Sequence, residues 1–305
     1  MDALSSLIKL VRLQASLELR CLLQGAFSIP HEQEQEASVP FHLVLNGACS
    51  VELPNARLLQ LQPGDFVLFP KGGAHRICDI GSSDMPIQPV TTSDDGLLPL
   101  RRNGSGPADV DLLCGRFLCE RGPAALLFKS LPDPLHISLS GTQSIASLQA
   151  VVTLMRNEAD SKASGALAIV SALSQALLVM ALRIYGERQS ALPNILTLLS
   201  DTRLSHSVQV LLAEPGREWT IAALGEVAAM SRATYARHFQ ARAGMTVAEF
   251  LTYVRMATAS ELLLRTKRSA ADIGMEVGYQ SEAAFGKAFR HNTGLTPGRY
   301  RLQHQ

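Results

Sequence analysis

The sequence predicts a two-domain α+β protein, with an N-terminal β-barrel and flanking helices followed by a C-terminal all-α domain. In the second domain two helix-turn-helix units are joined by a linker helix. Short alternating apolar runs fill residues 41–77, a helix-turn-helix pattern occurs twice after residue 220, and 305 residues that are 47% hydrophobic can bury two cores. We expect a barrel domain over 1–190, a linker over 191–203 and a helical domain over 204–305.

The N-terminal domain consists of strands separated by turn residues. Between Phe41 and Ile77 the pairs Asn-Gly and Pro-Asn and the triplet Pro-Gly-Asp divide the apolar runs, which is typical of antiparallel β structure. Residues 79–109 are rich in Ser, Asp, Gly and Pro and predict a long mobile loop, after which 110–120 resumes strand character. Residues 144–185 predict two helices with a break at 161–165. These helices are either buried or form a dimer interface, and the pattern leaves both interpretations open.

The C-terminal domain repeats one irregular pattern. Before the turn the two copies are 49 residues apart and after it they are 50 apart, so the second copy has one extra residue in its turn. The pairs that define this register are Ala222 and Ala271, Gly225 and Gly274, Ser231 and Ser281, Tyr235 and Phe285, Phe239 and Phe289, Gly244 and Gly294, and Thr246 and Thr296. A duplicated unit keeps its register on both sides of such an insertion. We therefore expect two related helix-turn-helix units.

Each unit pairs an inward aromatic face with an outward face of small residues and single cations. Small side chains let a helix approach the bases of a DNA major groove, and Arg and Lys reach base edges or phosphates. The alternative is a helical hairpin with a solvated face, but two copies in register favour DNA binding. Thr246 and Glu249 predict a capping box that opens a linker helix over 247–265. Residues 201–305 carry 13 basic and 9 acidic side chains, which also favours nucleic acid.

The segment from Leu204 to Arg301 resembles the C-terminal domain of the AraC family of bacterial transcription regulators. The motifs V-G-Y-x-S, F-x-K-A-F and G-x-T-P-x-x-Y-R in the second unit carry this resemblance. It implies a sequence-specific regulator, in most cases an activator, that binds double-stranded promoter DNA and contacts RNA polymerase. The candidate DNA-binding residues are Ser231, Arg232, Ala233, Ala236, Arg237, Ser281, Glu282, Ala283, Lys287 and Arg290. Gly225 and Gly274 replace the family's usual Ala, which we expect to reduce helix stability.

In the first domain Gly64, Pro70, Gly72 and His75 fit the spacing G-x5-P-x-G-x2-H, which resembles the second half of the cupin barrel motif. The first half needs H-x-H followed by Glu, whereas His42 stands alone. Two histidines without a carboxylate fall short of the three or four ligands of a firm metal site, so we expect no metal, no cofactor and no catalytic residue. His42 and His75 then either line an effector pocket or are structural. A metal-dependent cupin enzyme with an attached DNA-binding module is the least favoured alternative.

All five cysteines precede residue 120, and their odd number without C-x-x-C argues against a disulfide scaffold and a zinc ribbon. Cys21 follows Arg20, and a neighbouring cation can favour a thiolate. The whole chain also resembles the reactive-chlorine-responsive member of the AraC family, which implies Cys21 and Cys114 as redox-sensing residues.

The favoured interpretation is a regulator, not an enzyme, whose cupin-like domain responds to an oxidant through cysteine oxidation. A regulator that binds a small organic effector in the barrel is the alternative, and a homodimer is compatible with both. The N-terminus lacks the apolar run of a signal peptide, and the chain has no run of eighteen apolar residues. We therefore expect a cytoplasmic protein without a membrane span.

Overall fold

A computed structural model describes residues 2–304 except for 12, 35–37, 82–85, 95–97, 119–126, 129–130, 139–144, 162 and 189–192. The chain forms two compact units, which we call the barrel unit and the helical unit. The barrel unit takes its residues from 14–119 and 131–181, and the helical unit from 1–13, 120–130 and 182–305. The structure is thus a two-domain α+β protein, as the sequence predicts. The domain bounds at 190 and 204 remain a proposal.

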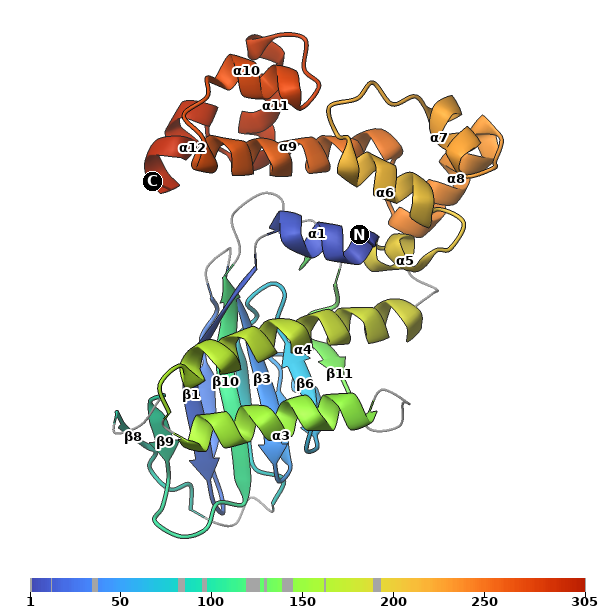
Figure 1. Cartoon of the computed structure of the whole chain (residues 1–305). Coiled ribbons are helices and arrows are strands. Elements are labelled where there is room, and N and C mark those ends of the chain that lie inside the picture. Colours follow the sequence, from blue (N-terminus) through green and yellow to red (C-terminus); the bar gives the residue numbers. More distant parts are fainter. Residues whose placement is uncertain are drawn as a thin grey trace. The chain divides into compact units, whose positions relative to one another are not determined.

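The barrel unit contains two sheets (Figure 1). The larger has seven strands in the order β11-β6-β3-β10-β1-β9-β8, and the smaller has four in the order β2-β7-β4-β5. The strands are β1 (Gln14–Leu23), β2 (Ser28–His31), β3 (Ser38–Asn46), β4 (Cys49–Glu52), β5 (Leu58–Leu61), β6 (Phe66–Leu68), β7 (His75–Cys78), β8 (Thr91–Ser93), β9 (Leu100–Arg102), β10 (Val110–Leu118) and β11 (Leu135–Ile137). The strands expected between Phe41 and Ile77 and after residue 110 are confirmed, and they pair antiparallel.

Strand β10 lies between β1 and β3 in the larger sheet, and both faces of this sheet are buried. Alternate side chains of the three strands, with those of the smaller sheet, form the apolar barrel interior; it includes Cys21, Val44, Leu112 and Cys114. The other alternating set contains three packed phenylalanine rings, Phe41, Phe66 and Phe117. Helices α3 (Ile145–Ser161) and α4 (Ala166–Arg188) lie across this second face (Figure 1). The interior therefore lies between the two sheets.

Residues 79–109 differ from the expected loop, because they contain the short strands β8 and β9. Strand β9 pairs parallel to β1, with Arg101 opposite Cys21. A three-residue strand is too short to show a clear alternation of apolar and polar residues in a segment rich in Ser, Asp and Gly. The composition of the segment therefore did not predict it. The expected helix break is confirmed at Gly165, where the backbone has a φ of 85° and α4 begins one residue later.

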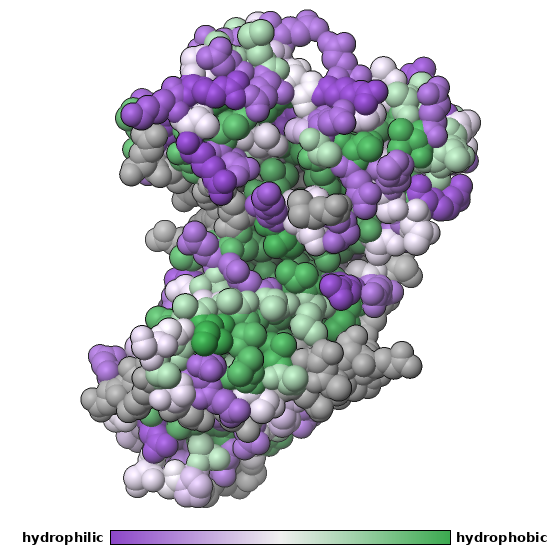
Figure 2. All heavy atoms as spheres, viewed as in Figure 1, coloured by the Kyte–Doolittle hydropathy of each residue, from purple (hydrophilic) through white to green (hydrophobic). Residues whose placement is uncertain are grey.

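The exposed side of α4 is mainly apolar, and α3 adds an exposed leucine to it. Figure 2 shows hydrophobic residues gathered over these helices, among them the exposed Leu154, Leu167 and Ile169. Among the described residues, α4 is the one helix whose length and apolar composition would suffice to cross a membrane, a test that core helices of soluble proteins also pass. An apolar helix face of this kind is suited to covering by another surface.

The helical unit begins with an element that the sequence analysis did not assign. Helix α1 (Ala3–Val11) buries Ala3, Leu7 and Val11, one residue on each successive turn, and packs against three later helices, α5, α6 and α9. Helix α5 lies inside the stretch 191–203 that we expected to be a linker, and it packs against α8. The later helices are α5 (Ile195–Ser200), α6 (Ser205–Ala213), α7 (Ile221–Val227), α8 (Arg232–Ala243), α9 (Val247–Arg265), α10 (Ala270–Glu276), α11 (Glu282–Thr293) and α12 (Pro297–His304).

The two helix-turn-helix units are confirmed as structural repeats. Helices α7 and α10 each have 7 residues, and α8 and α11 each have 12. Each helix of the two pairs starts after a Thr or Ser whose side chain accepts a backbone N–H bond, and both second helices end at a glycine with positive φ. The tight turn has a positive φ at Ala229 in the first unit and at Gly278 in the second, and the extra residue follows it. The capping box at Thr246 and Glu249 is also confirmed.

The glycines at 225 and 274 have a packing role that helix propensity alone does not reveal. A Cβ at Gly225 would lie 2.8 Å from the carbonyl oxygen of Met230, and one at Gly274 would lie 2.9 Å from the Cβ of Phe285. The missing side chain thus lets each first helix approach its turn or its second helix closely. In this chain, the close approach compensates for the reduced helix propensity of glycine.

We predict that Gly225→Ala lowers the free energy of unfolding of the helical unit by about 1–3 kcal/mol, because the backbone atom it meets cannot rotate away. Gly286→Ala is the matched control: nothing lies within 4 Å of its Cβ, and it should raise that free energy by about 0.5–1 kcal/mol. Urea unfolding followed by fluorescence of Trp219, the single tryptophan, reports on this unit. Equal effects of the two substitutions would contradict the prediction.

Candidate functional site

The helical unit presents the predicted DNA-binding residues on α8 and α11. Ser231 and Ser281 are the N-caps of these helices, and their hydroxyls accept the backbone N–H groups of Thr234 and Ala284. Of the predicted residues within the helices, Arg232, Ala233 and Arg237 of α8 and Glu282, Ala283, Lys287 and Arg290 of α11 are exposed, while Ala236 is half-buried. All ten residues therefore lie on or at the start of the second helix of a unit.

Buried aromatic residues set the orientation of both helices. Tyr235 and Phe239 in α8, and Phe285 and Phe289 in α11, have no exposed surface. The hydroxyl of Tyr235 also donates a hydrogen bond to Ser207 Oγ on α6 at 3.0 Å. Because residues three and four positions apart share a helix face, burying these rings turns the intervening cations outward. An open groove of about 790 Å³ runs beside α11 and is lined by Glu282, Lys287 and Arg290 among others.

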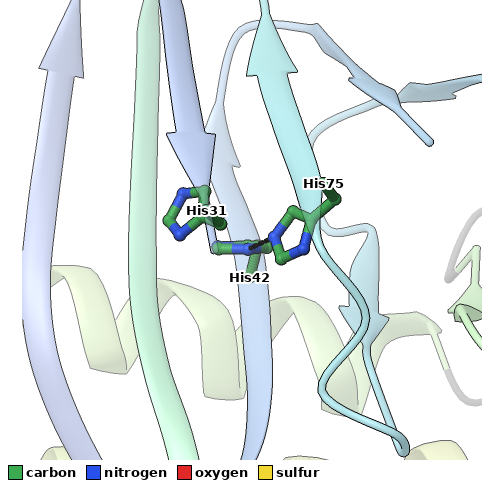
Figure 3. Close-up of side chains that lie close together, drawn as sticks. All are labelled: His31, His42 and His75. Carbon is green, nitrogen blue, oxygen red and sulfur yellow. Dashed lines mark hydrogen bonds between the residues drawn. The ribbon is translucent and has the colours of Figure 1, made fainter. Parts of the chain in front are cut away.

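The barrel interior holds a second group of candidate side chains, which we call the histidine–cysteine cluster: Cys21, His31, His42, His75 and Cys114. Cys114 and His42 are direct neighbours across β10 and β3, and His31 and His75 are direct neighbours across β2 and β7. One pair therefore belongs to each sheet. The pairs meet in the interior, where His42 Nε2 lies 2.7 Å from His75 Nε2 (Figure 3).

The two predicted redox cysteines are adjacent in this cluster. In the register of β1 and β10, Cys21 is opposite Leu112 and Leu19 is opposite Cys114, so the cysteines are diagonal neighbours on one face. The neighbouring Cys21 side chain raises the pKa of the Cys114 thiol. Cys114 Sγ also lies 3.1 Å from His42 Nδ1. All four cysteines in the described part of the chain are free thiols, and Cys119 lies outside that part.

The backbone fixes the direction of the hydrogen bonds. His75 Nδ1 lies 2.8 Å from the carbonyl oxygen of Gly73, which can only accept, so this nitrogen carries the proton. His75 Nε2 is then the acceptor for His42 Nε2–H, and His42 Nδ1 is left to accept the Cys114 thiol proton. A chain of hydrogen bonds between uncharged groups therefore runs from the Cys114 thiol through His42 and His75 to the carbonyl oxygen of Gly73.

Burial keeps the histidines uncharged. It lowers the pKa of His42 well below its usual value, lowers that of His75, and lowers that of His31 to about 3. The charge of Arg101 on β9 also lowers the His31 pKa. For Cys114, the hydrogen bond with Cys21 and burial raise the thiol pKa well above its usual value, and Arg101 opposes them. At neutral pH the cluster therefore contains neutral imidazoles and a protonated Cys114.

Arg20 does not have the role that its position beside Cys21 suggests. Its Nε and Nη2 donate to the two carboxylate oxygens of Asp111 at 2.9 and 2.8 Å, a bidentate ion pair. Adjacent strand residues point to opposite faces, so this pair lies on the side of the sheet away from Cys21. Arg101 is the cation whose charge acts on the cluster.

His31 is the cluster member that sequence reasoning missed. Its ring stacks on His75 with centroids 4.7 Å apart, and it lies 4.8 Å from the ring of His42. The signal was weak, because His31 and His42 are eleven residues apart, which is no metal-ligand spacing. Only the pairing of β2 with β7 brings His31 to His75. The predicted residues Cys21, Cys114, His42 and His75, proposed for two separate roles, form one cluster.

Comparison with known proteins agrees with the two-unit structure. Residues 2–187 match the Cupin family and residues 224–303 match a helix-turn-helix domain family. An uncharacterized HTH-type transcriptional regulator of Haemophilus influenzae is 35% identical, with 99% of this chain and 98% of the relative aligned. MtrA of Neisseria gonorrhoeae, an HTH-type transcriptional regulator, is 32% identical over 99% of both chains. RclR of Escherichia coli, an RCS-specific transcriptional activator, is 28% identical over 99% of this chain and 97% of its own.

We predict that the barrel unit loses stability as the pH falls below 6.5. A histidine kept neutral in the fold titrates near 6.5 when unfolded, so the unfolded state takes up more protons and becomes favoured. For His42 the loss is at most about 2 kcal/mol between pH 6.5 and pH 5. Calorimetry in the presence of a chelator measures it. His42→Gln should flatten the pH dependence and the exposed His206→Gln should not; an unchanged slope in His42→Gln contradicts the prediction.

Proposed function

This chain belongs to the AraC family of transcription regulators, in the branch with an N-terminal cupin domain, and we propose that it converts oxidation of a buried cysteine pair into altered promoter binding. The observation that carries the sensing part of this proposal is the placement of Cys21 and Cys114 as diagonal neighbours on one face of the sheet, beside His42. The similarity to RclR, whose name describes a response to reactive chlorine species, supports it.

The DNA-binding part rests on the two outward faces of α8 and α11. Helix α9 has 19 residues and joins the two helix-turn-helix units. At ~1.5 Å per residue it is about 28 Å long. Successive major-groove faces of a duplex are about 34 Å apart. We propose that the two second helices enter adjacent major-groove segments on one side of promoter DNA. Arg232, Arg237, Lys287 and Arg290 supply the charged contacts to bases or phosphates.

The chemistry of the sensor follows from the arrangement of the thiols. One thiol reacts with hypochlorous acid to give a sulfenyl chloride and water, and the second thiol displaces chloride to close a disulfide with release of HCl. Two thiols thus lose two electrons to one oxidant molecule. Closing a bridge needs Cα atoms about 4.4–6.8 Å apart. Diagonal neighbours on paired strands are about 7–8 Å apart, just beyond that range, so closing the bond requires the backbones of β1 and β10 to move together locally.

Burial protects the cysteine pair at rest. The raised pKa of Cys114 keeps its thiol protonated and slow toward bulky or charged reagents. A small uncharged oxidant can enter the interior more easily than an anion. His42 Nδ1, which accepts the thiol proton at 3.1 Å, is placed to receive it as sulfur becomes the nucleophile. These features support a response to hypochlorous acid.

Two partners complete the proposal. The exposed apolar faces of α3 and α4 support a homodimer formed through them, which would double the DNA footprint. Activation through contact with RNA polymerase follows the naming of RclR as an activator. A small organic effector near His42 and His75 is the alternative signal, and it is favoured if oxidation leaves DNA binding unchanged.

We predict that Arg237→Ala and Lys287→Ala each weaken binding to the DNA upstream of the protein's own gene by about 1–3 kcal/mol, or roughly 5- to 150-fold. Each loses a cation that the recognition face presents to DNA. Fluorescence anisotropy at fixed salt measures the affinity. Arg57→Ala, an exposed arginine of the barrel unit, is the charge-matched control and should bind like wild type. Equal losses in all three variants would point to nonspecific electrostatics.

We predict that hypochlorite changes the affinity of the wild-type protein for this DNA by about fivefold or more, reversibly with thiol. Cys21→Ser and Cys114→Ser should abolish the change because the pair cannot close. Cys78→Ser, a half-buried cysteine of the smaller sheet, is the matched control and should respond normally. Peptide mass spectrometry should show the Cys21–Cys114 link. Variants that respond like wild type would refute the redox proposal while leaving DNA binding intact.

A further inference from the structure

The three histidines of the cluster have the geometry of an incomplete coordination sphere. His31, His42 and His75 each offer a ring nitrogen, and these three atoms lie within 4.8 Å of one another (Figure 3). We propose that these residues bind one late first-row transition-metal ion inside the barrel. This site goes beyond the oxidant response and does not depend on it, because metal binding can be measured without DNA or oxidant.

His31 provides the first sign of an absent partner. Its Nε2 is buried and has no hydrogen-bond partner within the described part of the chain. Burying a polar nitrogen without a partner costs about 1–3 kcal/mol, so such an atom calls for an explanation. The ring stacks on His75 and lies close to His42, so His31 belongs to the same group of ligand candidates. A metal ion would satisfy it.

His75 is held as metal-binding histidines usually are. Its Nδ1–H donates to the carbonyl oxygen of Gly73 at 2.8 Å, which fixes the tautomer and leaves the Nε2 lone pair facing the cluster. On the opposite sheet, His42 is anchored through Nδ1 by Cys114, with its Nε2 facing the same point. Two histidines thus present Nε2, each oriented by a hydrogen bond at its other nitrogen.

The donor set selects the class of ion. No Asp or Glu of the described residues joins the three-histidine group, so hard cations such as Mg²⁺ and Ca²⁺, which take oxygen ligands, are disfavoured. Neutral imidazoles suit zinc, copper, nickel, cobalt and iron. All three histidines have a lowered pKa and are unprotonated at neutral pH, the form that coordinates a metal. The positive charge of Arg101 repels a bound cation. The same charge favours the neutral form of His31, which is the form that binds a metal.

Binding requires a defined rearrangement. Two nitrogens at about 2.0–2.1 Å from a tetrahedral ion are about 3.3 Å apart, so the 2.7 Å contact between His42 and His75 must open by about 0.6 Å. Binding also needs the other tautomer of His42: the Nε2 proton leaves to solvent, and Nδ1 takes up a proton and donates it to the Cys114 sulfur. The neutral ring then presents its Nε2 lone pair to the metal. His31 must swing inward from its stacked position, which its half-buried ring at the end of β2 can do. The fourth position is open to water or a small anion.

The test is titration of the chelator-treated, reduced full-length protein with Co²⁺, followed by competition with Zn²⁺. We expect one Co²⁺ per chain, ligand-field bands of a tetrahedral nitrogen-bound ion, and no sulfur-to-metal charge-transfer band. His31→Gln and His75→Gln should weaken binding about 100-fold or more, since even outer partners of metal ligands contribute 10–100-fold. The exposed His206→Gln is the matched control and should bind like wild type.

A second readout uses the wild-type protein alone, in case a variant misfolds. Bound Zn²⁺ should protect His31 from diethylpyrocarbonate, measured by peptide mass spectrometry, while His206 stays reactive. Failure to bind a stoichiometric ion, or equal binding by His31→Gln, His75→Gln and His206→Gln, would show adventitious binding only and overturn the proposal. Neither outcome would affect the oxidant experiment, which follows Cys21 and Cys114.

Discussion

The contact between His42 and His75 is the interaction on which the barrel interior depends. It joins a strand of the larger sheet to a strand of the smaller one through two nitrogens 2.7 Å apart, amid otherwise apolar packing. The contact cannot hold if both rings are charged, because neither Nε2 could then accept a hydrogen bond and two buried cations at that distance would repel strongly. The same contact links Cys114 to the second sheet, because the Cys114 thiol is hydrogen-bonded to Nδ1, the other ring nitrogen of His42.

The two units use polar groups in different ways. In the helical unit, caps and aromatic residues recur in both copies, and each copy buries its own core around rings such as Phe285 and Phe289. The cations of its second helices, such as Arg237 and Lys287, face outward, where ion pairs contribute little to stability and the charges remain available for DNA. In the barrel unit the ionisable groups face inward and occur once. Function in the first is therefore a surface property, whereas function in the second depends on the packing of the interior.

The helical unit was more predictable from sequence than the cluster. Local signals define it: Ser231, Ser281 and Thr246 are caps, and the aromatic spacing marks the buried faces. The cluster depends on which strands pair, and residues as distant as His42 and Cys114 carry no local sign of contact. Cys21, Cys114, His42 and His75 were found as candidates, but their meeting point and the third histidine were not. Helix α1 was missed because its partners follow it by nearly two hundred residues.

The packing of α1 also bears on how the protein is made. Helix α1 is translated before the barrel unit, yet the helices that cover its buried face, α5, α6 and α9, are translated after it. The apolar side of α1 therefore stays uncovered until the barrel unit has been synthesised. The contacts that cover it join residues far apart in the sequence, which corresponds to a high contact order. Completion of the helical unit is therefore a late, long-range step, and a fragment that begins at the second domain would leave the site of α1 uncovered.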